Sequence, residues 1–376
     1  KKNLTVRVKN WFDFSDLNEY ILHWKVTGDD GTVLAEGNKE VACEPHATVE
    51  LTLGAVQLPK TIREAYLDLG WTRKKSTPLV DTAWEIAYDQ FVLPASGKVW
   101  NGKPSEAGKT TFEVDENTGA LKSLCLDGEE LLASPVTISL FRPATDNDNR
   151  DRMGAKLWRK AGLHTLTQKV VSLKESKTSA TAQVNILNVT GKKVGDATLE
   201  YTLNHNGSLK VQTTFQPDTT WVKSIARLGL TFEMNDTYGN VTYLGRGEHE
   251  TYIDRNQSGK IGIYTTTPEK MFHYYVIPQS TGNRTDVRWV KLADDSGKGC
   301  WIESDSPFQF SALPFSDLLL EKALHINDLE RNGRITVHLD AKQAGVGTAT
   351  CGPGVLPLYL VPLGKQTFTF TIYPVK

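Results

Sequence analysis

Apolar and polar positions alternate along most of this chain with the period of two that an extended strand requires. In Tyr20–Val26 every second residue is large and apolar, whereas His23 and Lys25 fall on the opposite face. Successive side chains of a strand point to opposite faces, so this segment is predicted to be a half-buried strand. The same alternation predicts strands at Val6–Val8, Val49–Leu53, Ala65–Leu69, Trp84–Val92, Leu209–Phe215, Ala226–Met234 and Thr367–Tyr373.

Helix signals are sparse by comparison. Thr110–Leu132 has the turn clusters of successive hairpins. Arg152–Ala161 has apolar residues at helical spacing, and Ser316 is placed to cap a second short helix that runs to Leu324. Because strands do not alternate with long helices, a Rossmann domain or a TIM barrel is disfavoured. The chain is predicted to be all-β and built from stacked sandwiches.

A segment rich in Pro, Gly and Ser between residues 93 and 108 predicts a domain boundary. Residues 1–95 have the length and strand spacing of an immunoglobulin-like β-sandwich. Residues 96–376 are then predicted to form a second, large all-β domain.

Composition removes several function classes without assigning one. The chain has 376 residues, 43 Lys+Arg against 44 Asp+Glu, and a formal net charge of −1, which gives no support to a nucleic-acid or polybasic membrane partner. No apolar run is long enough to span a bilayer, so the chain is predicted to be soluble. Four scattered cysteines form no CxxC pair and do not indicate a compartment. The start at Lys1 is typical of a mature chain or an excised piece.

One stretch gathers groups that could carry acid–base chemistry. Gly245–Arg255 contains three carboxylates, two arginines and His249. Glu248 and Glu250 would point the same way on a strand, and two close carboxylates can hydrolyse a glycoside with retention. The neighbouring arginines, however, should depress the carboxylate pKa values, so a structural Arg–carboxylate network is the favoured interpretation.

Metal chemistry has weaker support. The eight histidines have no i, i+3 or i+4 pairing, although a site assembled from distant histidines stays open. Asp146–Asn149 resembles the start of a calcium loop but lacks the Gly and the bidentate Glu that such a loop needs, so turn chemistry is favoured.

Four segments together resemble the large C-terminal domain of family-2 β-galactosidases. Phe141–Asp148 (FRPATDND) is similar to the motif F-R-A-P-T-D-N-D, and Gly245–Arg255 is similar to G-R-G-P-x-E-N-Y-x-D-R. Pro278–Trp289 (PQSTGNRTDVRW) is similar to P-Q-E-x-G-N-R-T-D-V-R-W. Gln343–Gly347 and the later Cys351-Gly352 are similar to the family's Q-x-G-V-G-G segment and the W-G that follows it. Residues 1–95 resemble the immunoglobulin-like domain that precedes this one.

The resemblance implies an immunoglobulin-like β-sandwich at 1–95 followed by a galactose-mutarotase-like β-supersandwich at 96–376. In the family, the catalytic glutamates sit on a TIM barrel that would lie N-terminal to Lys1. The chain is therefore expected to be a non-catalytic C-terminal portion, inactive alone. The full-length, retaining enzyme would hydrolyse terminal β-D-galactosyl residues, and this portion would support assembly and form part of the substrate-pocket wall.

The same resemblance implies the partners. They are the N-terminal catalytic domains of the same enzyme and a β-galactoside or related saccharide. A homo-oligomer of this chain stays open. No cofactor or metal is expected in this chain, and any Mg and Na ions of the parent enzyme would be bound elsewhere.

A family tryptophan that contacts substrate corresponds to Cys351 here. Burying ~100 Å² of an aromatic ring against a sugar is worth about 2.5 kcal/mol at ~25 cal/mol/Å², which a cysteine cannot supply. Glu248, Thr251, Ser280 and Thr348 also depart from the motifs. We hypothesise that the scaffold is kept while the pocket wall is altered toward a different or larger β-linked sugar.

The residues implied for the pocket wall and its framework share a charged or aromatic side chain, apart from the cysteine. They are Cys351, Arg142, Asp146, Asp148, Arg246, Glu250, Tyr252, Asp254, Arg255, Arg284 and Arg288.

Two other functions stay open from sequence. The chain could be a stand-alone carbohydrate-binding or adhesion module, since nine Trp and twelve Tyr offer rings for stacking on sugars. It could also be an independent supersandwich enzyme such as a mutarotase or lyase. His249 and Glu250 are the nearest candidates for such chemistry.

Overall fold

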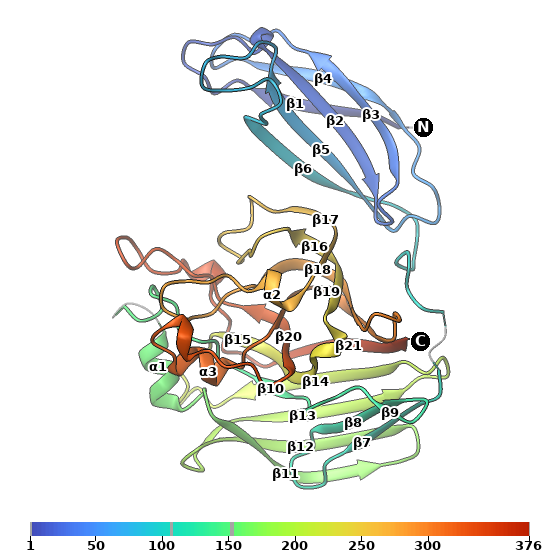
Figure 1. Cartoon of the computed structure of the whole chain (residues 1–376), viewed down its shortest axis with the longest axis vertical. Helices are drawn as coiled ribbons and strands as arrows, with labels where there is room; N and C mark the ends of the chain where they lie inside the picture. The colour runs from blue at the N-terminus through green and yellow to red at the C-terminus, as the bar shows by residue number, and fades with distance from the viewer. Residues whose placement is uncertain (1, 106–107, 151–153, 376) are drawn as a thin grey trace. The chain divides into compact units, whose positions relative to one another are not determined.

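The computed structural model describes residues 2–105, 108–150 and 154–375, and nearly all of its regular structure is antiparallel sheet (Figure 1). The predicted all-β fold class is confirmed. The chain divides into two compact units. One runs up to Lys103 and includes Ile261–Ile263, and the other takes the remainder from Pro104 onward. No helix in the described ranges is long and apolar enough to cross a membrane.

The first unit consists of two antiparallel sheets, ordered β1-β4 and β3-β2-β5-β6. Alternate side chains of β2, including Leu22, Trp24 and Val26, are buried as the sequence pattern predicts. They form one apolar cluster with Leu4, Leu53 and other residues. The strands are β1 Lys2–Lys9, β2 Tyr20–Gly28, β3 Val33–Glu40, β4 Thr48–Val56, β5 Glu64–Arg73 and β6 Ala87–Pro94, with a 3-10 turn η1 at Leu17–Glu19.

One predicted strand is wrong at its beginning. Trp84–Val92 was expected to be extended throughout, but β6 starts at Ala87. The N–H of Trp84 donates to the carbonyl of Asp81 at 3.1 Å, which closes a turn. The Trp84 side chain is therefore exposed instead of lying in the sheet core.

The second unit is dominated by one large antiparallel sheet. Its path runs β10-β15-β20-β19-β21-β14-β13-β12-β11, and β18 joins β19 to β16, which also pairs with β17. Its strands are β10 Thr137–Ser139, β11 Leu166–Glu175, β12 Ser179–Asn188, β13 Lys193–Leu203, β14 Leu209–Pro217, β15 Arg227–Asn235, β16 Asn240–Gly247, β17 Lys260–Thr266, β18 Arg284–Ala293, β19 Gly299–Leu313, β20 Arg334–Gln343 and β21 Gln366–Val375.

A smaller sheet and short helices complete this unit. The sheet β7-β8-β9 corresponds to the predicted hairpins. Helix α3 is capped by Ser316 as predicted, because its Oγ accepts the N–H of Leu319 at 3.3 Å. The predicted helix at 152–161 is found at 155–161, and its first two residues lie outside the described ranges. The elements are β7 Thr110–Val114, β8 Leu121–Leu126, β9 Glu129–Glu130, α1 Ala155–Ala161, α2 Pro268–Met271 and α3 Asp317–Lys322, with 3-10 turns η2 Asp236–Tyr238, η3 Ile326–Asp328 and η4 Pro357–Tyr359.

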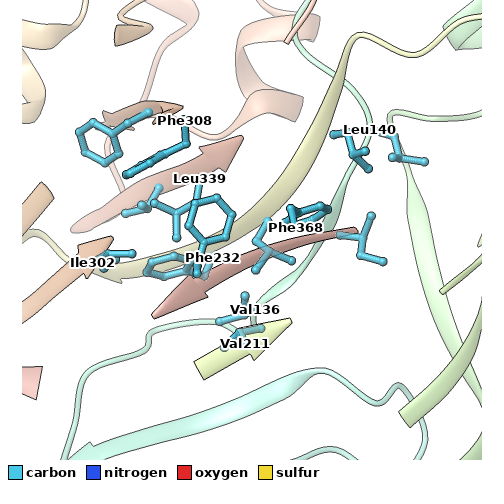
Figure 2. Packing of buried hydrophobic residues seen from close by; sticks show 14 of the residues in the cluster. Val136, Leu140, Val211, Phe232, Ile302, Phe308, Leu339 and Phe368 are labelled. Atoms are coloured by element: carbon cyan, nitrogen blue, oxygen red, sulfur yellow. The ribbon is translucent and has the colours of Figure 1, made fainter. Parts of the chain in front are cut away.

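The core of the second unit lies on one face of the central strands. Phe232, Ile302, Phe308, Leu339 and Phe368 belong to one continuous apolar cluster (Figure 2). Burying each of these side chains contributes about 1.5–3 kcal/mol relative to exposing it. The cluster fixes the central strands against one another, and hence the loops that leave them.

The opposite face of the central strand β20 is buried too, but it is polar. Along β20, Ile335, Val337 and Leu339 alternate with Thr336, His338 and Asp340, and all of them are buried. A strand buried on both faces must pair its polar side chains, because an unpaired buried polar group costs roughly 1–3 kcal/mol. The charged partners on this face are Asp317 of α3, which lies 3.1 Å from His338, and Arg227 of β15, which lies 3.5 Å from Asp340.

Candidate functional site

Arg142 lies at the centre of the motif network and is fully buried. Its guanidinium donates a two-pronged pair of hydrogen bonds to Asp148, Nε to Oδ2 at 3.0 Å and Nη2 to Oδ1 at 2.9 Å. Nη1 and Nη2 also donate to the carbonyls of Ala344 and Gly345, at 2.5 and 2.8 Å. A buried guanidinium needs a carboxylate and further acceptors to offset its desolvation. The first motif therefore anchors the start of the last one.

Two further side chains hold the loop that follows Gly345. The carboxylate of Asp254 accepts the N–H groups of Val346 and Gly347, at 3.0 and 2.8 Å. The amide of Asn147 donates to the carbonyl of Gly347 at 2.8 Å, and its Oδ1 accepts the N–H of Thr350 at 2.9 Å. Residues 344–350 are thus fixed by polar contacts from the first two motifs.

Glycine at position 345 is a steric requirement of this arrangement. A Cβ there would lie 2.4 Å from a carboxylate oxygen of Asp254, which is closer than real side chains approach. Cys351 lies at the end of the same loop, with its N–H donating to the carbonyl of Thr348 at 3.1 Å and its side chain exposed. Cys351 is therefore exposed to solvent at the end of a loop whose backbone is held by hydrogen bonds.

The third motif joins this framework through its amides and hydroxyls. The N–H of Asp146 donates to Gln279 at 3.1 Å, while the Asp146 side chain is exposed. Tyr252 is buried, and its hydroxyl lies 3.3 Å from the Ser280 hydroxyl. Burial raises the pKa of Tyr252, so this residue stays a neutral phenol. Asn283 accepts from the side-chain amide of Gln343 at 3.2 Å, which closes the network.

Glu250 accepts hydrogen bonds from several donors at once. Arg255 donates at 2.6 Å, the Thr281 hydroxyl at 3.1 Å and the Gly282 N–H at 2.9 Å, and the hydroxyl of Tyr275 is a further donor. Burial alone would raise the pKa of Glu250, but the bonds from Tyr275, Gly282 and Arg255 outweigh it and hold that pKa below its ordinary value. Glu250 is thus a stable carboxylate, as the sequence argument expected, and a poor proton donor.

The expected pairing of Glu248 with Glu250 on a strand is wrong. Strand β16 ends at Gly247, and the chain bends at Glu248 and His249. The bend directs the Glu250 carboxylate to the N–H of Gly282, whereas the Glu248 residue is exposed.

The remaining predicted arginines occupy two places. Arg246 pairs with Asp286 at 2.5 Å, and Nη1 of Arg288 donates to the carbonyl of Asp286 at 2.6 Å. Arg284 is buried elsewhere, with Nε donating to the hydroxyl of Tyr243 at 2.9 Å. The predicted residues therefore form a loop framework, an Asp286 cluster and the surroundings of Glu250, not one continuous site.

A cavity of about 350 Å³ opens beside Glu250. It is lined by His249, Glu250, Arg255, Ser258, Lys270, Met271, Phe272, His273, Tyr275 and Arg284. Lys270, His273 and Tyr275 are not among the residues predicted from sequence. The sequence feature that could have indicated them is the run Lys270–Tyr275 (KMFHYY). In this run, cationic and aromatic residues are interleaved shortly before the third motif.

A second buried polar cluster was also missed. His338 Nε2 lies 3.1 Å from Asp317 in α3, and Arg227 lies 3.4 Å from Asp317 and 3.5 Å from Asp340. Burial raises the pKa of Asp340, whereas His338 and Arg227 outweigh burial at Asp317 and lower its pKa. These residues are separated by up to 113 positions in sequence and share no motif, so no local sequence pattern predicts that they cluster. Among the described side chains, no group of three His, Cys, Asp or Glu is placed to hold a metal ion.

The fold and the framework define a class: an all-β chain of two units, in which buried Arg–carboxylate contacts fix one long loop. The profile "Beta galactosidase small chain" matches residues 106–372, and "Beta-galactosidase, domain 4" matches residues 6–94. The chain belongs to the β-galactosidase small-chain family. The resemblance predicted from the four motifs is thereby confirmed.

Individual relatives are β-galactosidases. The chain is 29% identical to the β-galactosidase of Priestia megaterium over 90% of its length and 34% of that enzyme. It is 28% identical to that of Kluyveromyces lactis over 80% of its length and 31% of that enzyme. The chain thus spans about a third of the length of the curated relatives it matches. Among solved structures, it is similar to an aldose epimerase homologue from C. elegans, with 13% identity, a TM-score of 0.41, and coverage of 72% of this chain and 98% of that chain.

Proposed function

We propose that this chain acts as the C-terminal portion of a β-galactosidase, where it joins the catalytic part of the enzyme and forms part of the wall of the substrate pocket. The observation that carries the proposal is the fixed loop at 344–351. Arg142, Asp254 and Asn147 hold its backbone, and it ends at the exposed Cys351.

The framework suits a wall better than a reaction centre. Arg142 and Asp148 are fully buried and use their polar atoms on each other and on backbone groups. Glu250 is held as a carboxylate by its donors, so it lacks the proton that a general acid must supply. The chemistry of glycoside cleavage is therefore assigned to the partner part of the enzyme.

The small side chain of Cys351 determines how much space the pocket wall leaves for a sugar. A small thiol leaves room where a ring would stack, so the pocket accepts a bulkier or differently shaped β-linked saccharide. Restoring a ring should favour a simple aryl β-galactoside by up to about 2.5 kcal/mol, if ~100 Å² of ring is buried.

The test is a comparison of Cys351→Trp with wild type in the complete enzyme. The ratio of kcat/KM for an aryl β-galactoside to kcat/KM for a β-linked oligosaccharide should rise at least tenfold. Leu358→Trp is the control, since it adds the same ring at an exposed position further along the chain. An unchanged ratio in Cys351→Trp would refute the role of this position in the pocket wall.

A further inference from the structure

Arg284 is a buried cation whose charge lacks a carboxylate partner in the described part of the chain. Only 2% of the residue is exposed. Nε donates to the Tyr243 hydroxyl, and Nη1 donates to the carbonyls of Gly282 and Asn283 at 3.0 and 3.3 Å. These acceptors are neutral, and Nη2 has no acceptor among the described residues.

Two other deeply buried arginines of this unit have carboxylate partners. Arg142 is paired with Asp148, and Arg227 lies within 3.5 Å of Asp317 and Asp340. A buried charge without a partner is costly, which is why such groups are normally paired. Arg284 differs from both, and it lines the cavity beside Glu250.

The cavity carries an excess of positive charge. Arg255, Lys270 and Arg284 line it, and Glu250 is its one acidic lining residue. The charge of Glu250 is already engaged by Arg255, whose guanidinium lies 2.6 Å away. Lys270 is exposed and forms no ion pair within the described ranges. Two cations therefore remain for a ligand.

Aromatic and hydroxyl groups of the lining suit a polar ring. His273 and Tyr275 meet edge to face, with ring centroids 4.5 Å apart, and His249 is hydrogen-bonded to the Ser258 hydroxyl at 2.7 Å. The volume of about 350 Å³ lies within the usual range of small-ligand pockets, roughly 300–1,000 Å³.

We propose that this cavity binds an oxyanion, a carboxylate, sulfate or phosphate group, through Arg284 and Lys270. The group is carried either by an acidic sugar, whose ring would occupy the space beside His273 and Tyr275, or by a free inorganic anion. A guanidinium and an ammonium are the donors that proteins use for such groups. The site is separate from the loop of Cys351 and does not require the proposed galactosidase role.

Binding to this chain is the test, measured by titration calorimetry with galacturonate, galactose and inorganic phosphate. Galacturonate is expected to bind at least tenfold more tightly than galactose, and Lys270→Ala should weaken that binding at least fivefold. Lys322→Ala is the matched control, because both lysines are exposed and lie in the last turn of a short helix. It should leave binding unchanged.

The anions also distinguish the two sources. If phosphate binds as tightly as galacturonate and Lys270→Ala weakens phosphate binding, the site is assigned to free anions. If galacturonate binds more tightly than phosphate, the site is assigned to acidic sugars. Arg284→Met should abolish binding of either, and Lys270→Ala keeps the proposal testable if that variant fails to fold. No binding of either anion at millimolar concentration, or binding that Lys270→Ala leaves intact, would overturn the proposal.

Discussion

Asp148→Ala should destabilise the second unit severely, because it leaves the Arg142 guanidinium buried without its carboxylate. The substitution removes the two hydrogen bonds from Arg142, at 3.0 and 2.9 Å, and the one from the N–H of Thr145 at 3.0 Å. Both charged side chains have no exposed surface, so solvent cannot replace the lost partner. Breaking a buried pair in this way costs about 3–5 kcal/mol.

Urea or thermal unfolding followed by circular dichroism measures this cost. At ~2–4 °C per kcal/mol for a unit of this size, the transition of the second unit should fall by about 10 °C. The transition of the first unit should not move, and so provides an internal reference. The matched control is Asp196→Ala, which breaks the half-exposed pair with Lys193 at 3.0 Å and should cost about 0–1 kcal/mol.

A double substitution separates charge from packing. Arg142→Met with Asp148→Leu removes both charges at once, so it should recover part of the stability that Asp148→Ala loses. Recovery should be incomplete, because the carbonyls of Ala344 and Gly345 lose their donor. If Asp148→Ala unfolds within about 1 kcal/mol of wild type, the account of this framework is wrong.

Three further outcomes follow from the same geometry. Asp254→Asn should loosen the loop at 345–350, seen as faster amide exchange at Val346 and Gly347, and unchanged exchange would contradict the anchoring role. In native protein, Cys351 should react first with a thiol reagent, because its side chain is exposed. Cys351→Ser should abolish the fast phase of that reaction, and a fast phase that persists in this variant would show that the loop hides the Cys351 thiol. The pKa of Glu250 is held below its ordinary value of 4.5, so its stabilising contribution is present above that pH and is lost as pH falls through the lower folded-state pKa. Glu250→Gln should therefore show a smaller loss of stability than wild type when urea unfolding is compared at pH 5 and pH 3, and an equal loss would refute the assignment.

Much of the architecture is predictable from the sequence, because apolar and polar residues alternate along half-buried strands with a period of two. The burial of Leu22, Trp24 and Val26 follows the alternation residue by residue. The failure at Trp84 has a local cause, since a turn closed by Asp81 takes the chain out of the extended conformation before β6 begins. A large apolar residue in an alternating run was not enough to identify a strand there.

The residues of the candidate site are likewise predictable from sequence only in part. Motif resemblance identified Arg142, Asp148 and Asp254, because their contacts join segments that are each recognisable in sequence. It could not place Lys270 in the cavity or show that Arg284 lacks a carboxylate. Those properties depend on how distant segments fold against one another, and a strand buried on both faces gives no sign in sequence of which polar residues will meet.

The measurement that tests the central claim most directly is the hydrolysis of a chromogenic aryl β-galactoside by three samples: this chain alone, the catalytic part of the enzyme alone, and the two together. The account predicts that this chain is inert and that the pair hydrolyses substrate much faster than the catalytic part does by itself. Turnover by this chain alone would contradict it, as would a catalytic part whose activity is the same with and without the chain.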